Sequence, residues 1–484
     1  MKKSFFYIIM LAIALAAGAQ ERLSLERCRQ QALEANKSLL VANEKKNQSE
    51  AMRQMAFDQF LPKVTANGAA IWSNRSVQLL SDDPQNNLNN LGTNLTSNIM
   101  DRLGNGVIAN YIASTNIVNN ISGDIDGLGQ SLVNDLNVDT KSIYAGMVSV
   151  TQPIFMGGKI RALYKIAAAN SEVKNLEYSK AIEDIIIQVD EYYWRVVSVE
   201  NKYRLAKEYC NLLDTLNHNV EEMVATGVAT RSDQLKVQVK LNEAQLSLTK
   251  AENGICLAKM ALAQLCGMPL DSNFVIEDSD LSQLPSINDT DVDMQKVYEN
   301  RNEMRMLQQA EIIAKEGVNM ARSTFMPNLV ANGGYIISNP NILNGFKQEF
   351  GGMFYGGFVL NFPIAHATSF HSLKLAKSKQ HEIECQVSEA KEMIKLQVTQ
   401  ISQQRKVAMK NYIQAESNIK SAEENLRLAQ ASFDEGVLSA SDLMGAQTAW
   451  MKAFSEKIDA AIDLKINDMY LNRALGEKQI KNSK

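Results

Sequence analysis

The sequence has few cysteines, little excess charge and few histidines. The five cysteines among its 484 residues form no C-x-x-C pair, and their number is odd, which argues against a disulfide framework. We expect them to act as buried apolar filler. The net charge of -4 indicates no basic surface for a polyanion, so nucleic acid is not an expected partner.

Catalytic and metal-binding patterns are also missing. The few histidines near residue 370 do not show the i, i+4 spacing of a helical metal site. No Ser/His/Asp, Cys/His or paired-carboxylate arrangement can be recognised in the sequence. We therefore expect no enzyme activity, no metal site and no cofactor.

Long apolar runs are absent after the N-terminus. Residues 1–19 combine a basic start, an apolar run from Phe5 to Ala17 and an A-x-A-type cleavage site at Ala17-Gly18-Ala19, which predicts a secretory signal peptide. No later segment approaches the roughly 20 apolar residues that a membrane-spanning helix needs. If the exported chain enters a membrane, we expect it to do so as β-strands.

What the sequence does contain is an internal duplication. Phe60-Leu61-Pro62 returns as Phe325-Met326-Pro327, and the prolines of Gln152-Pro153-Ile154 and Phe362-Pro363-Ile364 also correspond. We divide the chain into a first repeat, a linker, a second repeat and a C-terminal tail, at residues 20–267, 268–290, 291–476 and 477–484.

Each repeat is predicted to open with a helix, over 23–58 or 291–323, that ends at the Phe-x-Pro motif because proline disfavours helix in the residue before it. Two strand-like stretches of about ten residues follow in each repeat, a length that suits transmembrane barrel strands. They span 64–72 and 144–152 in the first repeat, and 329–337 and 350–362 in the second. An Asn-rich insert at about 74–141, partly helical in pattern, separates the first pair.

A very long helix comes next, over about 159–225 or 368–434, and at 1.5 Å per residue it would span roughly 100 Å. Its apolar positions recur on average near every 3.5 residues, which predicts a left-handed coiled coil. A return helix of half that length follows. We expect helix 291–323 to stack end to end on return helix 232–266, helix 23–58 to stack on 441–475, and the linker to form a belt around the middle of the rod.

These motifs together resemble the TolC-like outer-membrane efflux proteins, the outer membrane factor family. The segment Thr151-Gln152-Pro153-Ile154-Phe155-Met156-Gly157-Gly158-Lys159 is similar to the family's strand-to-helix junction. Asn361-Phe362-Pro363-Ile364 and Ala474-Leu475-Gly476 also fit, as does a motif found twice between the long helix and the return helix, Gly227 to Asp233 and Gly436 to Asp442. The resemblance covers essentially all of the mature chain except the insert.

The resemblance implies a mainly α-helical fold with a small β part. Long coiled-coil hairpins would form a periplasmic tunnel, and three chains with four strands each would build a 12-stranded outer-membrane β-barrel without a free sheet edge in lipid. The implied function is the exit duct of a tripartite efflux or secretion system, which conducts cargo passively. Its partners would be two further copies in a homotrimer, a periplasmic adaptor (membrane fusion) protein, an inner-membrane transporter and outer-membrane lipid.

The alternative function is that of a soluble periplasmic coiled-coil interaction protein. Such a rod would have no use for the four strand-like stretches and their proline boundaries. In the family interpretation, Pro62, Pro153, Pro327 and Pro363 mark the junction between barrel and tunnel.

The resemblance places Asp233 and Asp442 at the constricted end of the tunnel, where a ring of carboxylates favours cations. A structural interpretation has equal weight, because Thr230-x-x-Asp233 and Ser439-x-x-Asp442 also match a capping box at the start of the return helix. One residue can serve both purposes.

The family's polar lock residues beside the second motif are replaced here. Phe433 stands in place of a Tyr, Leu438 in place of an Arg and Gly445 in place of a second Asp. A gate that is looser or apolar, and that uses Phe433 and Leu438, is therefore expected.

The glycines of the two motifs, Gly227 and Gly436, are predicted turn residues with positive φ. The residues around them would form the apex that meets the adaptor, and they are Val228, Thr230, Val437 and Ser439.

Overall fold

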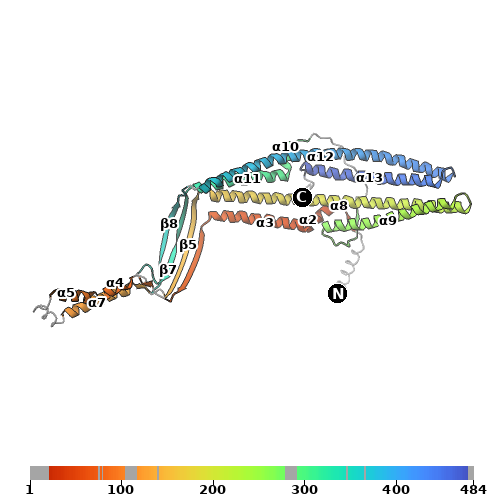
Figure 1. Ribbon diagram of the computed structural model, residues 1–484. Helices are drawn as coiled ribbons and strands as arrows, with labels where there is room; N and C mark the ends of the chain where they lie inside the picture. The colour runs from red at the N-terminus through yellow and green to blue at the C-terminus, as the bar shows by residue number, and fades with distance from the viewer. Residues whose placement is uncertain are drawn as a thin grey trace, which may run out of the picture. The chain divides into compact units, whose positions relative to one another are not determined.

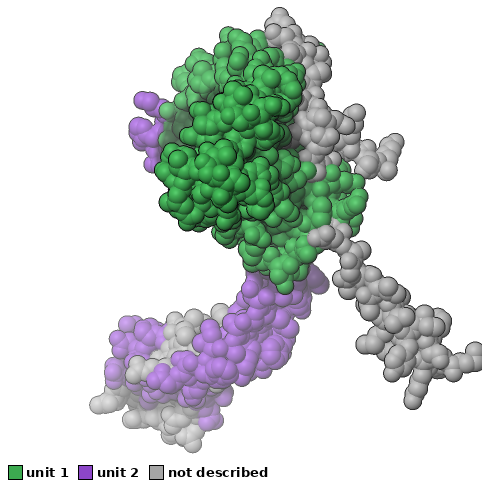
Figure 2. All heavy atoms as spheres, turned by 90° about the vertical axis from the view of Figure 1, so that its right-hand side faces the viewer, with its two compact units in different colours: residues 1–53, 165–318, 375–484 green, residues 54–164, 319–374 purple. Residues whose placement is uncertain are grey.

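The computed structural model describes residues 21–74, 77–78, 80–103, 117–138, 141–277, 292–344, 347–364 and 367–477. The predicted signal peptide and residues 278–290 of the predicted linker lie outside them. The chain forms two compact units, which consist of residues 1–53, 165–318 and 375–484, and of residues 54–164 and 319–374 (Figure 2). The fold is mainly helical with a small β part, as predicted.

Two long helical hairpins dominate the first unit. Helix α8 (Lys159–Ala225) is followed by α9 (Arg231–Leu265), which runs back along it, and α12 (Ala367–Asp434) is followed in the same way by α13 (Ala440–Ala474) (Figure 1). The predicted helix boundaries are confirmed to within one residue. No described helix combines the length and apolar composition that crossing a membrane requires.

The helices that open the two repeats are broken, so the prediction of single helices was wrong. The first consists of α2 (Leu25–Ala35) and α3 (Lys37–Phe57), and the second of α10 (Met294–Asn300) and α11 (Asn302–Arg322). Asn36 and Arg301 stand at the breaks with extended backbones, at ψ 118° and 128°. The Asn36 side chain accepts a hydrogen bond from the backbone N–H of Ser38, a local bond that competes with helix continuation.

The return helices stack within their own repeats, which corrects the predicted exchange between repeats. A Cβ added to Gly267, just after α9, would lie 2.3 Å from Cβ of Ala35 in α2. The equivalent atom on Gly476, just after α13, would lie 2.9 Å from Cβ of Asn300 in α10. The end of each return helix therefore abuts the break in the opening helix of its own repeat.

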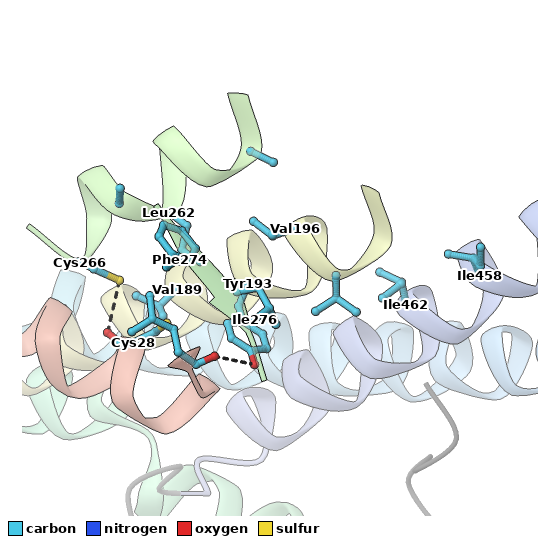
Figure 3. Packing of buried hydrophobic residues seen from close by; sticks show 14 of the residues in the cluster. Cys28, Val189, Tyr193, Val196, Leu262, Cys266, Phe274, Ile276, Ile458 and Ile462 are labelled. Atoms are coloured by element: carbon cyan, nitrogen blue, oxygen red, sulfur yellow. Dashed lines mark hydrogen bonds between the residues drawn. The ribbon is translucent and has the colours of Figure 1, made fainter. Parts of the chain in front are cut away.

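The largest apolar core of the first unit surrounds a short parallel pair of strands, β1 (Glu21–Leu23) and β6 (Phe274–Ile276). Leu23, Phe274 and Ile276 are fully or almost fully buried in it together with residues of α2, α8 and α9 (Figure 3). The described part of the predicted linker thus contributes a strand to the core.

A buried ion pair joins α2 to α8 in the same unit. The Arg29 guanidinium donates to both carboxylate oxygens of Asp190, at 2.7 and 2.6 Å. The Asp190 side chain is only 2% exposed, so its charge depends on Arg29 for compensation.

The second unit contains a four-stranded antiparallel sheet in the order β2-β5-β7-β8. Its strands are β2 (Lys63–Trp72), β5 (Ser142–Met156), β7 (Asn328–Asn339) and β8 (Gly351–Asn361). All four predicted strands are confirmed. Strand β5 continues beyond the predicted end at Gln152, because a register shift between Pro153 and Phe155 accommodates the proline.

The insert is partly helical, as predicted. It contains a two-stranded pair, β3 (Val77–Gln78) with β4 (Asn137–Val138), and the helices α4 (Asp82–Asn89), α5 (Leu91–Leu103) and α7 (Ile117–Leu136). Asp126 of α7 accepts hydrogen bonds from the N–H groups of Gly92 and Thr93 and from the Thr93 hydroxyl. These bonds hold the start of α5 against α7.

The predicted burial of the cysteines is confirmed at three positions and wrong at two. Cys28, Cys210 and Cys266 are buried, whereas Cys256 and Cys385 are exposed. The two exposed cysteines lie on outward-facing positions of α9 and α12, where filling a core is not required of them.

Candidate functional site

The site begins with the turn that ends each long helix. Gly227 and Gly436 have φ of 80° and 76°, which confirms the predicted positive φ. Val228 donates its N–H to the carbonyl of Met223 at 2.8 Å, and Gly227 donates to Val224 at 3.1 Å. This pair of bonds is a Schellman motif, which satisfies carbonyls at the helix end and favours glycine at this position.

The second turn has the same hydrogen bonds. Val437 donates its N–H to Ser432 at 2.9 Å, and Gly436 donates to Phe433 at 2.9 Å. A Cβ added to either turn glycine would meet no atom within 4 Å. The glycines are therefore required by backbone conformation and not by close packing.

The return helices start with the predicted caps. Thr230 Oγ1 accepts the N–H of Asp233 at 3.2 Å, and the Asp233 carboxylate accepts the Thr230 N–H at 3.4 Å, which completes a capping box. In the second motif, Ser439 Oγ accepts the N–H of Asp442 at 3.2 Å and donates to its carboxylate at 2.6 Å.

The two aspartates have different electrostatic surroundings. The hydrogen bond from the Thr230 hydroxyl, followed by that from the Lys236 ammonium at 3.0 Å, lowers the pKa of Asp233. Asp442 is exposed and forms hydrogen bonds with Ser439. It forms no ion pair within the described residues. Asp442 is thus the more available of the two for an ion or a partner.

Both tips share one apolar core, so the duplication brings the two motifs to the same end of the hairpins. Leu216, Val220 and Val237 of the first hairpin pack there with Phe433 and Leu443 of the second. Phe433 is 6% exposed, while Leu438 packs at the margin of the core and is partly buried. In this conformation Phe433 joins the two tips and does not lie on an open surface.

The apex of each tip is apolar and exposed. Val228 is 72% exposed and Val437 is 83% exposed. Thr230 and Ser439 are exposed beside them. Each tip therefore presents a protruding valine next to a hydroxyl, on a turn whose backbone is held by the bonds described above.

The four prolines lie at the ends of the strands, in the second unit. Pro62 and Pro327 follow the 3-10 turns Asp58–Phe60 and Ser323–Phe325 and precede β2 and β7. Pro153 lies within the end of β5, and Pro363 follows β8. A bond from the Gln152 side chain to the Phe60 carbonyl, at 2.9 Å, connects two of these ends.

Polar contacts between the two hairpins were not predicted from the sequence. Lys202 of α8 pairs with Asp459 of α13 at 2.6 Å, and Tyr209 hydrogen-bonds Thr448 at 3.0 Å. Further contacts join Tyr470 to Glu191 and Arg473 to Asp184. Charged residues are so frequent along these helices that no sequence pattern distinguishes the paired ones.

Comparison with known proteins identifies the family. The family model for outer membrane efflux proteins matches residues 120–268 and 294–477, more than half of the chain. A search of curated protein sequences finds no match.

Solved structures share the fold at low sequence identity. The CmeC outer membrane channel of Campylobacter jejuni is 16% identical with a TM-score of 0.71, over 95% of this chain and 87% of that one. The MtrE outer membrane channel of Neisseria gonorrhoeae is 18% identical with a TM-score of 0.68, over 95% and 90%. The outer membrane protein VceC of Vibrio cholerae is 14% identical with a TM-score of 0.70, over 94% and 96%.

The matched residues include α8, α9, α12 and α13, the hairpins that carry both tips. The alignments with the solved channels extend beyond the family match, because they cover 94–95% of this chain. This chain belongs to the outer membrane efflux protein family.

Proposed function

We propose that the protein is the outer-membrane exit duct of a tripartite efflux or secretion system. It would conduct cargo passively, while an inner-membrane transporter supplies the energy and a periplasmic adaptor joins the two. The observation that carries this proposal is the shared tip, where both repeats present an exposed valine on a capped, glycine-dependent turn.

The sheet supports assembly into a trimer. Within the described residues, strands β2 and β8 each pair on one side only, so both edges of the four-stranded sheet are open there. Open edges are not tolerated in lipid, and four strands are too few to close a barrel. Three copies joined edge to edge would provide 12 strands and leave no free edge.

The exposed side chains of the sheet support contact with lipid. Phe354, Phe358 and Leu360 of β8 are 82%, 75% and 65% exposed. A single water-soluble domain rarely exposes so many large apolar side chains on one strand. These side chains suit the outer surface of a barrel in the outer membrane.

The tips are proposed as the adaptor contact and the gate. The adaptor would offer the tips an apolar surface that also carries hydrogen-bonding groups. The apolar surface would contact Val228 and Val437, and the hydrogen-bonding groups would contact Thr230 and Ser439. Asp233 and Asp442 would form carboxylate rings at the narrow end of the trimer, with Leu438 at the margin of the tip core.

The soluble-rod alternative is disfavoured by the family match and by the apolar sheet. A direct test uses a strain that lacks the gene, complemented with the wild type, and measures drug susceptibility together with the partitioning of the protein into outer membranes. A protein found wholly in the soluble periplasmic fraction would rule out the duct.

The adaptor contact can be tested with tip variants. We expect the double variant Val228→Asp with Val437→Asp to lose cross-linking to the adaptor and to return susceptibility to that of the deletion strain. Leu128→Asp in the insert is a matched control, since Leu128 is 67% exposed but lies far from the tips in sequence. Full resistance and full cross-linking in the tip variant, at equal protein amounts, would refute docking at the valines.

A further inference from the structure

Two cysteines that are distant in sequence meet in the core around β1 and β6. Cys28 belongs to α2 and Cys266 is the C-cap residue of α9, and they are 238 positions apart. They are 0% and 2% exposed. The Cys266 thiol donates a weak hydrogen bond to the Cys28 carbonyl oxygen, with Sγ and O 3.6 Å apart (Figure 3).

The end of α9 that carries Cys266 packs against α2, which carries Cys28. Gly267, directly after Cys266, has no room for a Cβ, because that atom would lie 2.3 Å from Cβ of Ala35. Ala35 and Cys28 are two helical turns apart on the same face of α2, with buried Ala32 between them. A disulfide bond requires that the two Cα atoms lie within about 7 Å of each other.

The two thiols lie in the same buried apolar cluster. A hydrogen bond with the Cys28 side chain lowers the pKa of Cys266 and outweighs the effect of burial, which raises it. A lower pKa increases the fraction of thiolate, the form that attacks disulfides.

We propose that Cys28 and Cys266 form a disulfide bond in the exported protein. An outer membrane protein passes through the bacterial periplasm, where disulfides form and persist. Both thiols are buried once the chain is folded, so we expect the bond to form as α9 closes on α2.

The oxidant is a protein disulfide of the periplasm, and the exchange balances without any other reactant. The Cys266 thiolate attacks one sulfur of the oxidant, forms a mixed disulfide and displaces the second oxidant sulfur as a thiolate. The Cys28 thiolate then attacks Cys266 Sγ and displaces the first oxidant sulfur. The two protons lost by the cysteines are taken up by the two oxidant thiolates, so the oxidant is reduced to a dithiol.

The second repeat provides an internal comparison. Ala35 corresponds to Asn300 and Gly267 to Gly476, as their equivalent contacts show. On that alignment Cys28 corresponds to Asp293 and Cys266 to Leu475. In the second repeat the end of the return helix therefore packs on the opening helix without a cysteine at either position. Packing alone does not require cysteine there.

The disulfide would link only one pair of elements. It would tie α2 to the end of α9, next to the core of β1 and β6. The tip core contains no cysteine among its described residues, so the bond would add no covalent link between the tips.

The test counts thiols in the full chain, exported by a Gram-negative host and isolated from outer membranes. Samples are quenched in acid, denatured and alkylated with N-ethylmaleimide, and the added groups are counted by mass spectrometry. We expect three of the five cysteines to be alkylated in the wild type, and all five after reduction. Unreduced tryptic digests should contain the linked peptides of Cys28 and Cys266.

Matched serine variants distinguish the pair, because each leaves four cysteines. Cys28→Ser and Cys266→Ser should each show four alkylated cysteines, whereas Cys256→Ser should show two. Denaturation before alkylation makes the count independent of correct folding. Five alkylated cysteines in the wild-type membrane protein, or a linked peptide that contains Cys210, Cys256 or Cys385, would overturn the proposal.

Discussion

At the scale of single residues, Ser439 and Asp442 separate the capping role from the gating role. Ser439→Ala removes the side chain that caps α13 but keeps the carboxylate, and we expect it to lower stability by about 1 kcal/mol without changing cation conductance. Asp442→Asn removes the charge but keeps an oxygen for the Ser439 hydroxyl, and we expect altered cation conductance with nearly unchanged stability. Planar bilayer recordings and chemical denaturation measure the two effects, and unchanged currents in Asp442→Asn would exclude a carboxylate ring at this position.

Asp233 should make stability depend on pH. Its pKa is lowered in the folded chain by the Thr230 hydroxyl and by Lys236, so the charged form stabilises the fold. That contribution is complete above the ordinary aspartate pKa and is lost as the pH falls through the lowered value, below about 4. We expect the thermal midpoint of Asp233→Asn to lie below that of the wild type at neutral pH, and the two midpoints to converge in acid. A constant difference at every pH would contradict this origin.

The buried ion pair between Arg29 of α2 and Asp190 of α8 is the third test at this scale. Arg29→Ala leaves the Asp190 carboxylate buried without its partner, and we expect a loss of about 3–5 kcal/mol. Arg29→Met combined with Asp190→Leu removes both charges and should recover most of that loss. Denaturant unfolding of the two variants measures the difference, and a double variant no more stable than Arg29→Ala would show that the pair itself is required.

At the scale of elements, two glycines with the same backbone conformation should respond differently to substitution. Gly227 and Gly267 have φ of 80° and 70°, so alanine at either position costs about 1–2 kcal/mol of backbone strain. Only Gly267 also meets a neighbour, Cβ of Ala35, and overpacking adds about 1–3 kcal/mol there.

The comparison is sharpened by a compensating change. Adding Ala35→Gly to the Gly267→Ala variant should recover the loss of stability that comes from overpacking. The loss that comes from backbone strain should remain, and thermal unfolding in detergent measures both. Equal losses in Gly227→Ala and Gly267→Ala would mean that the stacked joint between α9 and α2 is looser than its contacts indicate.

At the scale of the whole molecule, the open edges of β2 and β8 predict the assembly. We expect a complex of three chains in detergent, by native mass spectrometry or light scattering, since three copies pair all six open edges. A stable monomer in detergent would mean that a single chain has another way to cover its edges.

Much of this architecture could be predicted from the sequence, because the signals are local. The turn glycines, the Thr230 and Ser439 caps, the prolines at the strand ends and the heptad spacing each act within one or two helical turns. They determined the repeats, the boundaries of the long helices and return helices, and the position of the tips.

Only the tertiary structure decided which surfaces meet. Both schemes of helix stacking satisfy the same lengths and periods, and the contact of Gly267 with Ala35 selects the one within each repeat. The burial of Phe433 between the tips and the meeting of Cys28 with Cys266 likewise depend on contacts between residues about 200 or more positions apart in sequence. Local propensity and periodicity carry no information about such pairs, since they constrain each helix and not its neighbour.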